Sequence, residues 1–175
     1  MQIERCLLQL LLSAGLCAAA ETPVDFDPFQ ETEAAYNARA QWLRDAKFGV
    51  FIHWNPSSLV AKEISWCRGD VGREKYDGLY KEFKGENFNA DEWIGLFREA
   101  GIRYAVFVPK HHDGFCMFDT KTSDYNVMRS LFGRDYIKEV SQACQHGGVR
   151  FCLYYSILDW WNPRYSGAKG ADLTA

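Results

Sequence analysis

Histidines and a tyrosine follow three apolar segments of the sequence, at the point where each segment ends. His53 closes the first segment, His111 and His112 follow the second, and Tyr154 lies near the end of the third. A neutral imidazole offers one hydrogen-bond donor and one acceptor. Such rings, beside aromatic surface, suit a neutral polyhydroxylated ligand, whose hydroxyls need both kinds of partner and whose apolar faces pack on rings.

The three segments that must position these residues have the length and composition of buried strands. They span residues 48–54, 104–108 and 149–155, and each is a nearly unbroken apolar run. Runs of this kind are typical of parallel strands covered on both faces. Because proline lacks the N–H that a central strand donates, we predict that Pro109 ends the second strand.

A helix is predicted before the second strand and another before the third. Asn89 can cap the first of these helices, Glu92 stands in the capping-box position, and Gly101 is a natural stop. The second helix begins at Asp135 and ends at the glycine pair 147–148. A further amphipathic helix is predicted over residues 31–43.

This order of elements predicts an α/β fold with a parallel sheet joined by crossover helices. A doubly wound open sheet and a (β/α)8 barrel share the pattern. No G-x-G-x-x-G motif follows the first strand to favour a dinucleotide-binding fold. Polar and aromatic residues at the carboxyl ends of the strands match the rim of an eight-stranded barrel, where active sites are built.

The long segments that leave the strands hold the other candidate site residues. Residues 55–70 include Glu63, Trp66 and Arg68, and loops of this length in compact domains are usually functional or disordered. Simpler interpretations remain open: His53 as a core histidine, His111 to Asp113 as a turn, and Glu63 with Arg68 as an exposed ion pair.

A metal site formed by the histidines and Asp113 is a further alternative. Histidine and carboxylate are good ligands for zinc or iron. Adjacent histidines on an extended segment tend to point apart, however, and the sequence has no H-E-x-x-H spacing. We therefore predict that these residues bind no metal.

The first twenty residues have the features of a secretory signal peptide. Arg5 precedes an apolar run, and small residues close the segment at Ala20. We predict cleavage before Glu21 and a secreted or periplasmic protein, or a lysosomal one in a eukaryote. The apolar run is shorter than the roughly 20 residues that a bilayer requires, so we predict no stable membrane insertion.

The composition bears on partners and on cysteine chemistry. A net charge of −3 gives no reason to expect nucleic acid as a partner. The four cysteines after the predicted signal have no zinc-type spacing, and we expect buried free thiols, although export would permit disulfides. They are Cys67, Cys116, Cys144 and Cys152. The sequence does not predict the oligomeric state.

Taken together, these segments resemble the α-L-fucosidases of glycoside hydrolase family 29. The matching stretches are Lys47-Phe-Gly-Val-Phe-Ile-His-Trp54, Phe88-Asn-Ala-Asp-Glu-Trp93, Ala100-Gly-Ile-Arg-Tyr104, Lys110-His-His-Asp-Gly-Phe115, Arg134-Asp135 and Tyr154 to Trp160. They follow the family's order over about residues 40–162.

The resemblance implies the N-terminal part of a (β/α)8-like barrel, with about three strands present over residues 21–175. It implies hydrolysis of terminal α-L-fucose from glycans or glycoconjugates by a retaining double displacement, without a cofactor. By position, His53, His111, His112 and Tyr154 are similar to the residues that bind fucose, and Glu63 and Trp66 to a glutamate and tryptophan of the same pocket. The family pattern has the last two adjacent, whereas Ile64 and Ser65 separate them here.

The resemblance also implies that the nucleophile and the acid/base carboxylate would follow Ala175. We therefore expect no catalytic residue within this chain, an incomplete barrel, and doubtful activity of the 175 residues alone. Two alternatives from other classes remain: a fucose-binding fragment or pseudoenzyme without catalysis, and a metal-dependent hydrolase.

Overall fold

The computed structural model describes residues 30–62 and 64–165. The predicted signal peptide, residues 1–20, therefore lies outside the described residues, as does Glu63. The described residues belong to two units, which divide between Gln41 and Trp42. Helix α2, Glu33–Ala46, begins in the first unit, where the guanidinium of Arg39 makes a bidentate ion pair with Glu31 at 2.8 Å.

A three-stranded parallel sheet forms the centre of the second unit. Its strands are β1, Gly49–Ile52, β2, Tyr104–Lys110, and β3, Arg150–Tyr155, in the order β1-β2-β3. Gly49 pairs with Tyr104, and Tyr104 pairs with Arg150, so the three strands start at one level. The α/β class and the parallel strands predicted from the sequence are confirmed.

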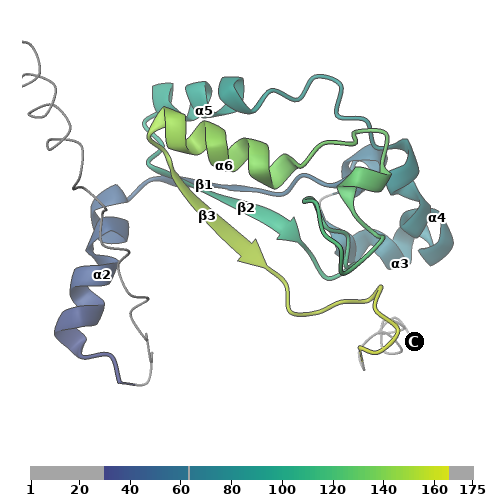
Figure 1. Cartoon of the computed structure of the whole chain (residues 1–175), viewed down its shortest axis with the longest axis horizontal. Helices are drawn as coiled ribbons and strands as arrows, with labels where there is room; N and C mark the ends of the chain where they lie inside the picture. The colour runs from purple at the N-terminus through teal and green to yellow at the C-terminus, as the bar shows by residue number, and fades with distance from the viewer. Residues whose placement is uncertain (1–29, 63, 166–175) are drawn as a thin grey trace, which may run out of the picture. The chain divides into compact units, whose positions relative to one another are not determined.

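Helices α5, Ala90–Glu99, and α6, Tyr136–Gly147, lie side by side on one face of the sheet (Figure 1). The predicted cap at Asn89 is present: its side chain accepts from the backbone N–H groups of Asp91 and Glu92. Asp135, predicted as the first residue of its helix, caps α6 instead and accepts from the backbone N–H of Lys138. Gly148 ends α6 in the left-handed conformation, with φ of 68°.

The prediction that Pro109 ends the second strand is wrong. β2 continues through Pro109 to Lys110, and the ladder to β3 is irregular between Phe107 and Lys110. The missing N–H of Pro109 therefore falls where the regular ladder is interrupted, and the Pro109 carbonyl accepts from the backbone N–H of Met117. The strand thus reaches the first residue before the histidine pair.

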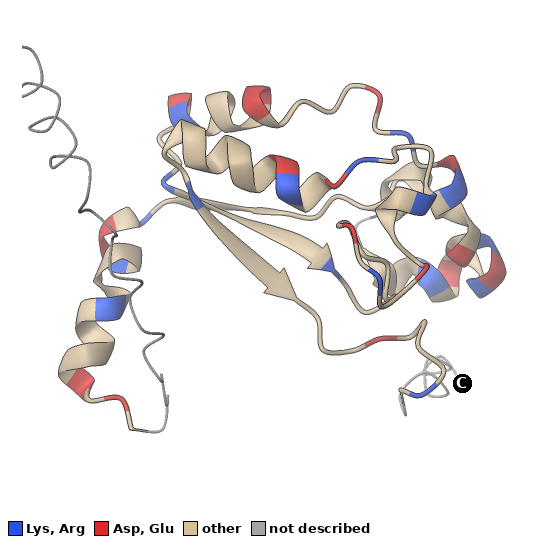
Figure 2. Ribbon diagram, viewed as in Figure 1, with Lys and Arg blue, Asp and Glu red and all other residues tan. Residues whose placement is uncertain are grey.

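Short helices make up much of the chain between β1 and α5, and one more follows β2. Their bounds are η1 Pro56–Val60, η2 Ser65–Cys67, α3 Arg68–Val71, α4 Arg73–Gly78, η3 Leu79–Glu82 and η4 Val127–Arg129. Figure 2 shows that residues of both charge signs are interspersed along these segments. No helix in the described residues is long and apolar enough to cross a membrane.

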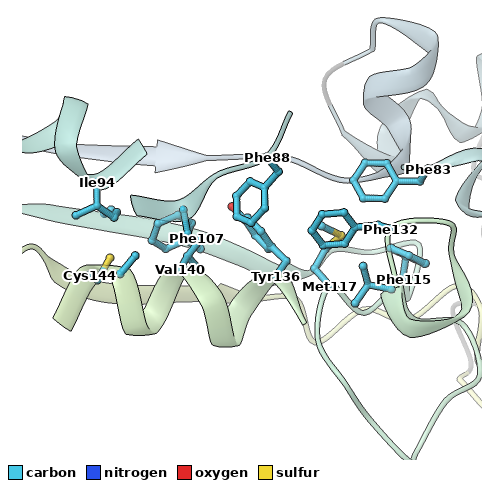
Figure 3. Packing of buried hydrophobic residues seen from close by; sticks show 14 of the residues in the cluster. Phe83, Phe88, Ile94, Phe107, Phe115, Met117, Phe132, Tyr136, Val140 and Cys144 are labelled. Carbon is cyan, nitrogen blue, oxygen red and sulfur yellow. The ribbon is translucent and has the colours of Figure 1, made fainter. Parts of the chain in front are cut away.

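The core lies between the sheet and the two long helices and extends into the loops at the strand ends. Figure 3 shows a continuous row of side chains from Ile94 and Cys144 at one end to Phe83 and Phe115 at the other. Trp54, which follows β1, contacts five aromatic rings in or against this core. They belong to Phe83, Phe88, Trp93, Phe132 and Tyr136, with centroids 4.9–5.6 Å away.

The other face of the sheet carries apolar side chains that remain accessible. Phe51 of β1 and Leu153 of β3 are each 49% exposed. All four cysteines of the described residues are free thiols, as expected; Cys152 is only partly buried.

Candidate functional site: a histidine cluster at the carboxyl ends of the strands

The parallel register brings the predicted site residues from three strands to one edge of the sheet. The ring centroids of His53 and His111 lie 5.7 Å apart, and those of His111 and Tyr154 lie 6.0 Å apart. The rings of His111 and His112 stack at 4.1 Å with an interplanar angle of 26°. Together with Trp66, these four residues form what we call the histidine cluster.

The stacking of His111 on His112 shows that the expectation of diverging rings is wrong. Adjacent histidines were expected to point apart, as alternate residues of an extended strand do. The chain instead turns at this point, and the two rings lie side by side. The described residues nevertheless contain no group of three or more His, Cys, Asp or Glu side chains with metal-site geometry.

A tight turn after β2 produces this arrangement. The backbone N–H of Gly114 donates to the carbonyl of His111 at 3.1 Å, and Gly114 has φ of 87°. That conformation favours glycine. A Cβ at Gly114 would also meet Asp159 and, at 2.8 Å, Cβ of Trp161. The turn is thus packed tightly against the segment that follows β3.

Trp66 lies over the second histidine from the segment between β1 and α5. It is in η2 and 57% exposed, and its ring contacts His112 edge-to-face at 4.9 Å. Trp160, which is buried, contacts both Trp66 and His112. Trp66 therefore offers an accessible aromatic surface beside the imidazole pair. Glu63, the carboxylate predicted for the same segment, lies outside the described residues.

Two serines that the sequence analysis did not single out contact the histidine pair. Ser65 Oγ lies 2.5 Å from Nδ1 of His111, and Ser156 Oγ lies 2.5 Å from Nδ1 of His112. Both serines are almost completely buried. Serine is too common for either position to stand out in a sequence, and each is more than 40 residues from its histidine.

The turn is also tied to the chain before α5 by a buried carboxylate. Asp113 accepts a 2.8 Å hydrogen bond from the hydroxyl of Tyr76 in α4 and another from the backbone N–H of Phe115. Burial raises the pKa of Asp113 to about 6, although these donors and the nearby Arg68 act in the opposite direction.

One simpler interpretation of the sequence was an exposed ion pair between Glu63 and Arg68. The structure pairs Arg68 with a different carboxylate and buries it. The Arg68 residue is 4% exposed, and its guanidinium makes a bidentate ion pair with Asp77, with both N–O distances at 2.7 Å. This geometry joins α3 to α4 and supports Tyr76, which lies on the same helix as Asp77. Arg68 therefore has a structural role and is not part of the histidine cluster.

A buried lysine joins β2 to the segment after β3. Lys110 Nζ donates to the carbonyl of Leu158 at 2.9 Å and lies 3.6 Å from a carboxylate oxygen of Asp159. The backbone N–H of Trp160 donates to the carbonyl of His112 at 2.8 Å. A lysine at the end of an apolar strand is a visible sequence signal for this role.

The surroundings of the histidine pair favour neutral rings. Burial lowers the pKa of His111 to about 4, with further lowering by His112, His53 and Lys110. Burial and Lys110 also lower the pKa of His112. Neutral imidazoles each keep one donor and one acceptor nitrogen, so the cluster has the mixed hydrogen-bonding capacity that a polyol requires.

Comparison with known proteins gives a consistent family assignment. The family model described as alpha-L-fucosidase matches residues 16–174. Human plasma alpha-L-fucosidase is 32% identical over 166 residues, which cover 83% of this chain and 35% of the human protein. A putative alpha-L-fucosidase of Caenorhabditis elegans is 33% identical over 143 residues, or 71% of this chain and 30% of that protein.

Solved structures agree. Alpha-L-fucosidase isoenzyme 1 from Paenibacillus thiaminolyticus superposes with a TM-score of 0.68 at 37% identity, covering 73% of this chain and 30% of that one. An alpha-L-fucosidase from Lactobacillus casei in complex with alpha-L-fucose product has a TM-score of 0.68 at 35% identity, covering 79% and 46%. The chain spans about a third of the length of the curated relatives that it matches. Because the family model matches nearly the whole chain, the chain belongs to the α-L-fucosidase family.

Proposed function

We propose that the protein to which this chain contributes hydrolyses terminal α-L-fucose from glycans or glycoconjugates, and that the histidine cluster binds the fucose ring. The observation that carries the proposal is the convergence of three imidazoles, Tyr154 and Trp66 on one edge of a parallel sheet. In α/β barrels this edge is where substrates bind.

The cluster has the chemistry that a pyranose needs. Imidazole nitrogens and the Tyr154 hydroxyl can each exchange hydrogen bonds with sugar hydroxyls, while the exposed ring of Trp66 can cover an apolar face of the sugar. Glu63 remains part of the proposal as a further polar group of the same segment. Structures of related fucosidases with a fucose product and with 4-nitrophenyl fucoside support this choice of ligand.

For the architecture, we propose that residues 21–175 form the N-terminal part of a (β/α)8-like barrel. The support is the accessible apolar face of the sheet, with Phe51 and Leu153 about half exposed. Further strands of a closed barrel would cover such a face. The class of fold shared with the solved fucosidases is consistent with this proposal.

For the chemistry, we propose a retaining double displacement. Such enzymes use two carboxyl groups about 5–5.5 Å apart, one as nucleophile and one as acid/base. A related fucosidase from Bacteroides thetaiotaomicron was trapped as a covalent intermediate. We propose that neither group comes from the described residues, and that the cluster contributes by binding and orienting the sugar.

A second candidate function is fucose binding without hydrolysis. One observation favours it, because two carboxylates near the strand ends already have partners. Asp113 accepts a hydrogen bond from Tyr76, and Asp159 pairs with Lys110. Under this alternative the cluster would bind fucose with similar affinity, but no fucoside would be cleaved.

Release of 4-nitrophenol from 4-nitrophenyl α-L-fucoside by the full protein from its source tests the first proposal. His112→Gln should lower kcat/KM at least about tenfold, the value of one hydrogen bond of roughly 1.4 kcal/mol. His146→Gln is the matched control, because His146 is exposed in the last turn of α6. Equal kcat/KM for both variants would contradict the placement of the site. Fucose binding without any release of nitrophenol would favour the second candidate.

We also propose that residues 1–20 direct export, so that the mature protein is secreted or periplasmic, or lysosomal in a eukaryote. The relation to a plasma fucosidase supports this. N-terminal sequencing of the mature protein should give Glu21 as the first residue. A mature protein that begins at Met1 would contradict it.

A further inference from the structure

We infer that Ser65 and Ser156 fix opposite tautomers in His111 and His112, so that the histidine cluster presents one N–H donor and one nitrogen acceptor side by side to its ligand. The inference rests on the proposed function only for the identity of the ligand. The tautomers themselves follow from hydrogen bonds within the described residues.

The tautomer of His112 follows from the two contacts of Ser156. Its Oγ lies 2.5 Å from Nδ1 of His112 and 3.3 Å from the carbonyl oxygen of Leu158. A carbonyl only accepts, and a hydroxyl has one hydrogen to donate. Both contacts are hydrogen bonds only if that hydrogen goes to Leu158 and Nδ1 of His112 donates to Ser156. In a neutral ring, Nε2 of His112 is then the acceptor.

The tautomer of His111 follows from the burial of Ser65. The Ser65 residue has no exposed surface, and in the described part of the chain the hydrogen-bond partner of its Oγ is Nδ1 of His111. If Nδ1 donated, the buried Ser65 hydroxyl hydrogen would have no acceptor, at a cost of about 1–3 kcal/mol. Ser65 therefore donates to Nδ1, and Nε2 of His111 carries the hydrogen.

Both Nε2 atoms remain available to a ligand. Among the described residues, the only buried side-chain nitrogen or oxygen without a hydrogen-bond partner is the hydroxyl of Tyr136. The structure gives hydrogen bonds to Nδ1 of each histidine and none to Nε2. Each Nε2 atom must therefore retain accessible surface. Because the two rings stack at 4.1 Å, the donor and the acceptor belong to adjacent rings.

This arrangement of one donor and one acceptor favours ligands that can both accept and donate hydrogen bonds. One hydroxyl of a pyranose can accept from His111 while a neighbouring hydroxyl donates to His112. A carboxylate or a phosphate dianion can only accept, so it would leave the lone pair of His112 without a donor. An ammonium group can only donate and would leave the N–H of His111 without an acceptor. The pair thus favours a neutral diol over charged ligands of similar size.

Imidazole nitrogen-15 NMR spectra of the full protein, labelled selectively in histidine and recorded without ligand near pH 7, test the assignment. His111 should give the pattern of the Nε2–H tautomer and His112 that of the Nδ1–H tautomer. His112→Gln identifies which signals belong to which ring. The same tautomer in both rings would overturn the inference, and this comparison needs no serine variant.

Serine variants then test the cause. Ser65→Ala should change the tautomer ratio of His111 alone, and Ser156→Ala that of His112 alone, each by about three- to tenfold, as expected for loss of one hydrogen bond. Ser65→Thr and Ser156→Thr, which keep the hydroxyl, should restore the ratio. Ser141→Ala on α6, whose Oγ bonds to the Lys138 carbonyl, is the matched control. Unchanged ratios in folded alanine variants would overturn the inference.

Addition of L-fucose separates this inference from the proposed function. If the ligand-free tautomers are opposite but fucose shifts neither Nε2 signal, the tautomer assignment stands and the fucose site is wrong. If fucose shifts the signals but both rings share one tautomer, the site stands and the inference is wrong.

Discussion

The hydroxyl of Tyr76 donates a 2.8 Å hydrogen bond to the carboxylate of Asp113, and both side chains are almost completely buried. This contact joins α4 to the turn that presents His111 and His112. Tyr76→Phe removes the donor and keeps the ring. Because a hydrogen bond to a charged group contributes about 1.5–3 kcal/mol, we expect a loss of this size in the free energy of unfolding.

Urea unfolding of the full protein measures this change. Tyr36→Phe is the control, since Tyr36 is 49% exposed, and it should leave the free energy of unfolding unchanged. If Tyr76→Phe matched this control, the hydrogen bond would not be a stabilising contact.

The His111 ring should remain neutral in mildly acidic solution. The pKa of His111 is lowered to about 4 by burial, with further lowering by His112, His53 and Lys110. We expect its imidazole to titrate well below pH 6.5 in proton NMR spectra, with the exposed His146 followed in the same sample. A midpoint near 6.5 for His111 would contradict the structure.

The pKa of His111 is lowered and the pKa of Asp113 is raised, and these two changes predict how the free energy of unfolding depends on pH. The folded-state pKa of His111 lies below its unfolded value, so its contribution is present above pH 6.5 and is lost as the pH falls toward 4. The folded-state pKa of Asp113 is raised to about 6, so its contribution is present below about pH 3.8 and is lost as the pH rises through 6. In a pH series of urea unfolding, Asp113→Asn should therefore steepen the loss of stability between pH 6 and pH 4. An unchanged slope would show that Asp113 does not oppose His111.

Gly114 should tolerate no side chain. Its φ is 87°, and a Cβ there would meet Asp159 and Trp161. Gly148 is a matched control, because it is in the left-handed conformation with φ of 68° and nothing lies within 4 Å of its Cβ position. Both alanine variants should share a backbone cost of roughly 1–2 kcal/mol. Only Gly114→Ala should also displace the turn and lower kcat/KM for 4-nitrophenyl fucoside. Equal kcat/KM in the two variants would contradict this.

Trp54 should be a principal stabilising residue of the core. Its ring contacts five aromatic neighbours, so Trp54→Ala is expected to cost about 3–5 kcal/mol of unfolding free energy. Trp161→Ala, which removes a ring that stacks on Tyr125 and is 42% exposed, should cost under about 2 kcal/mol. Similar losses in denaturant titrations would argue against a core centred on Trp54.

The sequence predicted the elements well where local chemistry decides them. Asn89 and Asp135 cap their helices, Gly148 ends one, and the three apolar runs form the three strands. Pro109 was misjudged because the irregularity that accommodates it depends on the partner strand. A single strand carries no local signal for such an interruption in its ladder.

The residues of the candidate site were easier to select from the sequence than the residues that position them. His53, His111, His112 and Tyr154 are unusual residues near strand ends, Trp66 lies in the segment between β1 and α5, and the structure brings the five together. Ser65 and Ser156 act through contacts across more than 40 residues, and the stacking of the two imidazoles depends on the turn at Gly114. These features arise from tertiary packing, which residue types alone do not encode.

The most direct test of the account is the intact mass of the full protein before and after treatment with 2-fluoro-fucosyl fluoride. We predict the gain of a single 2-fluorofucosyl group, and a loss of that gain when excess L-fucose competes for the histidine cluster. An unmodified protein, under conditions in which a known α-L-fucosidase is labelled completely, would contradict the proposed retaining hydrolysis.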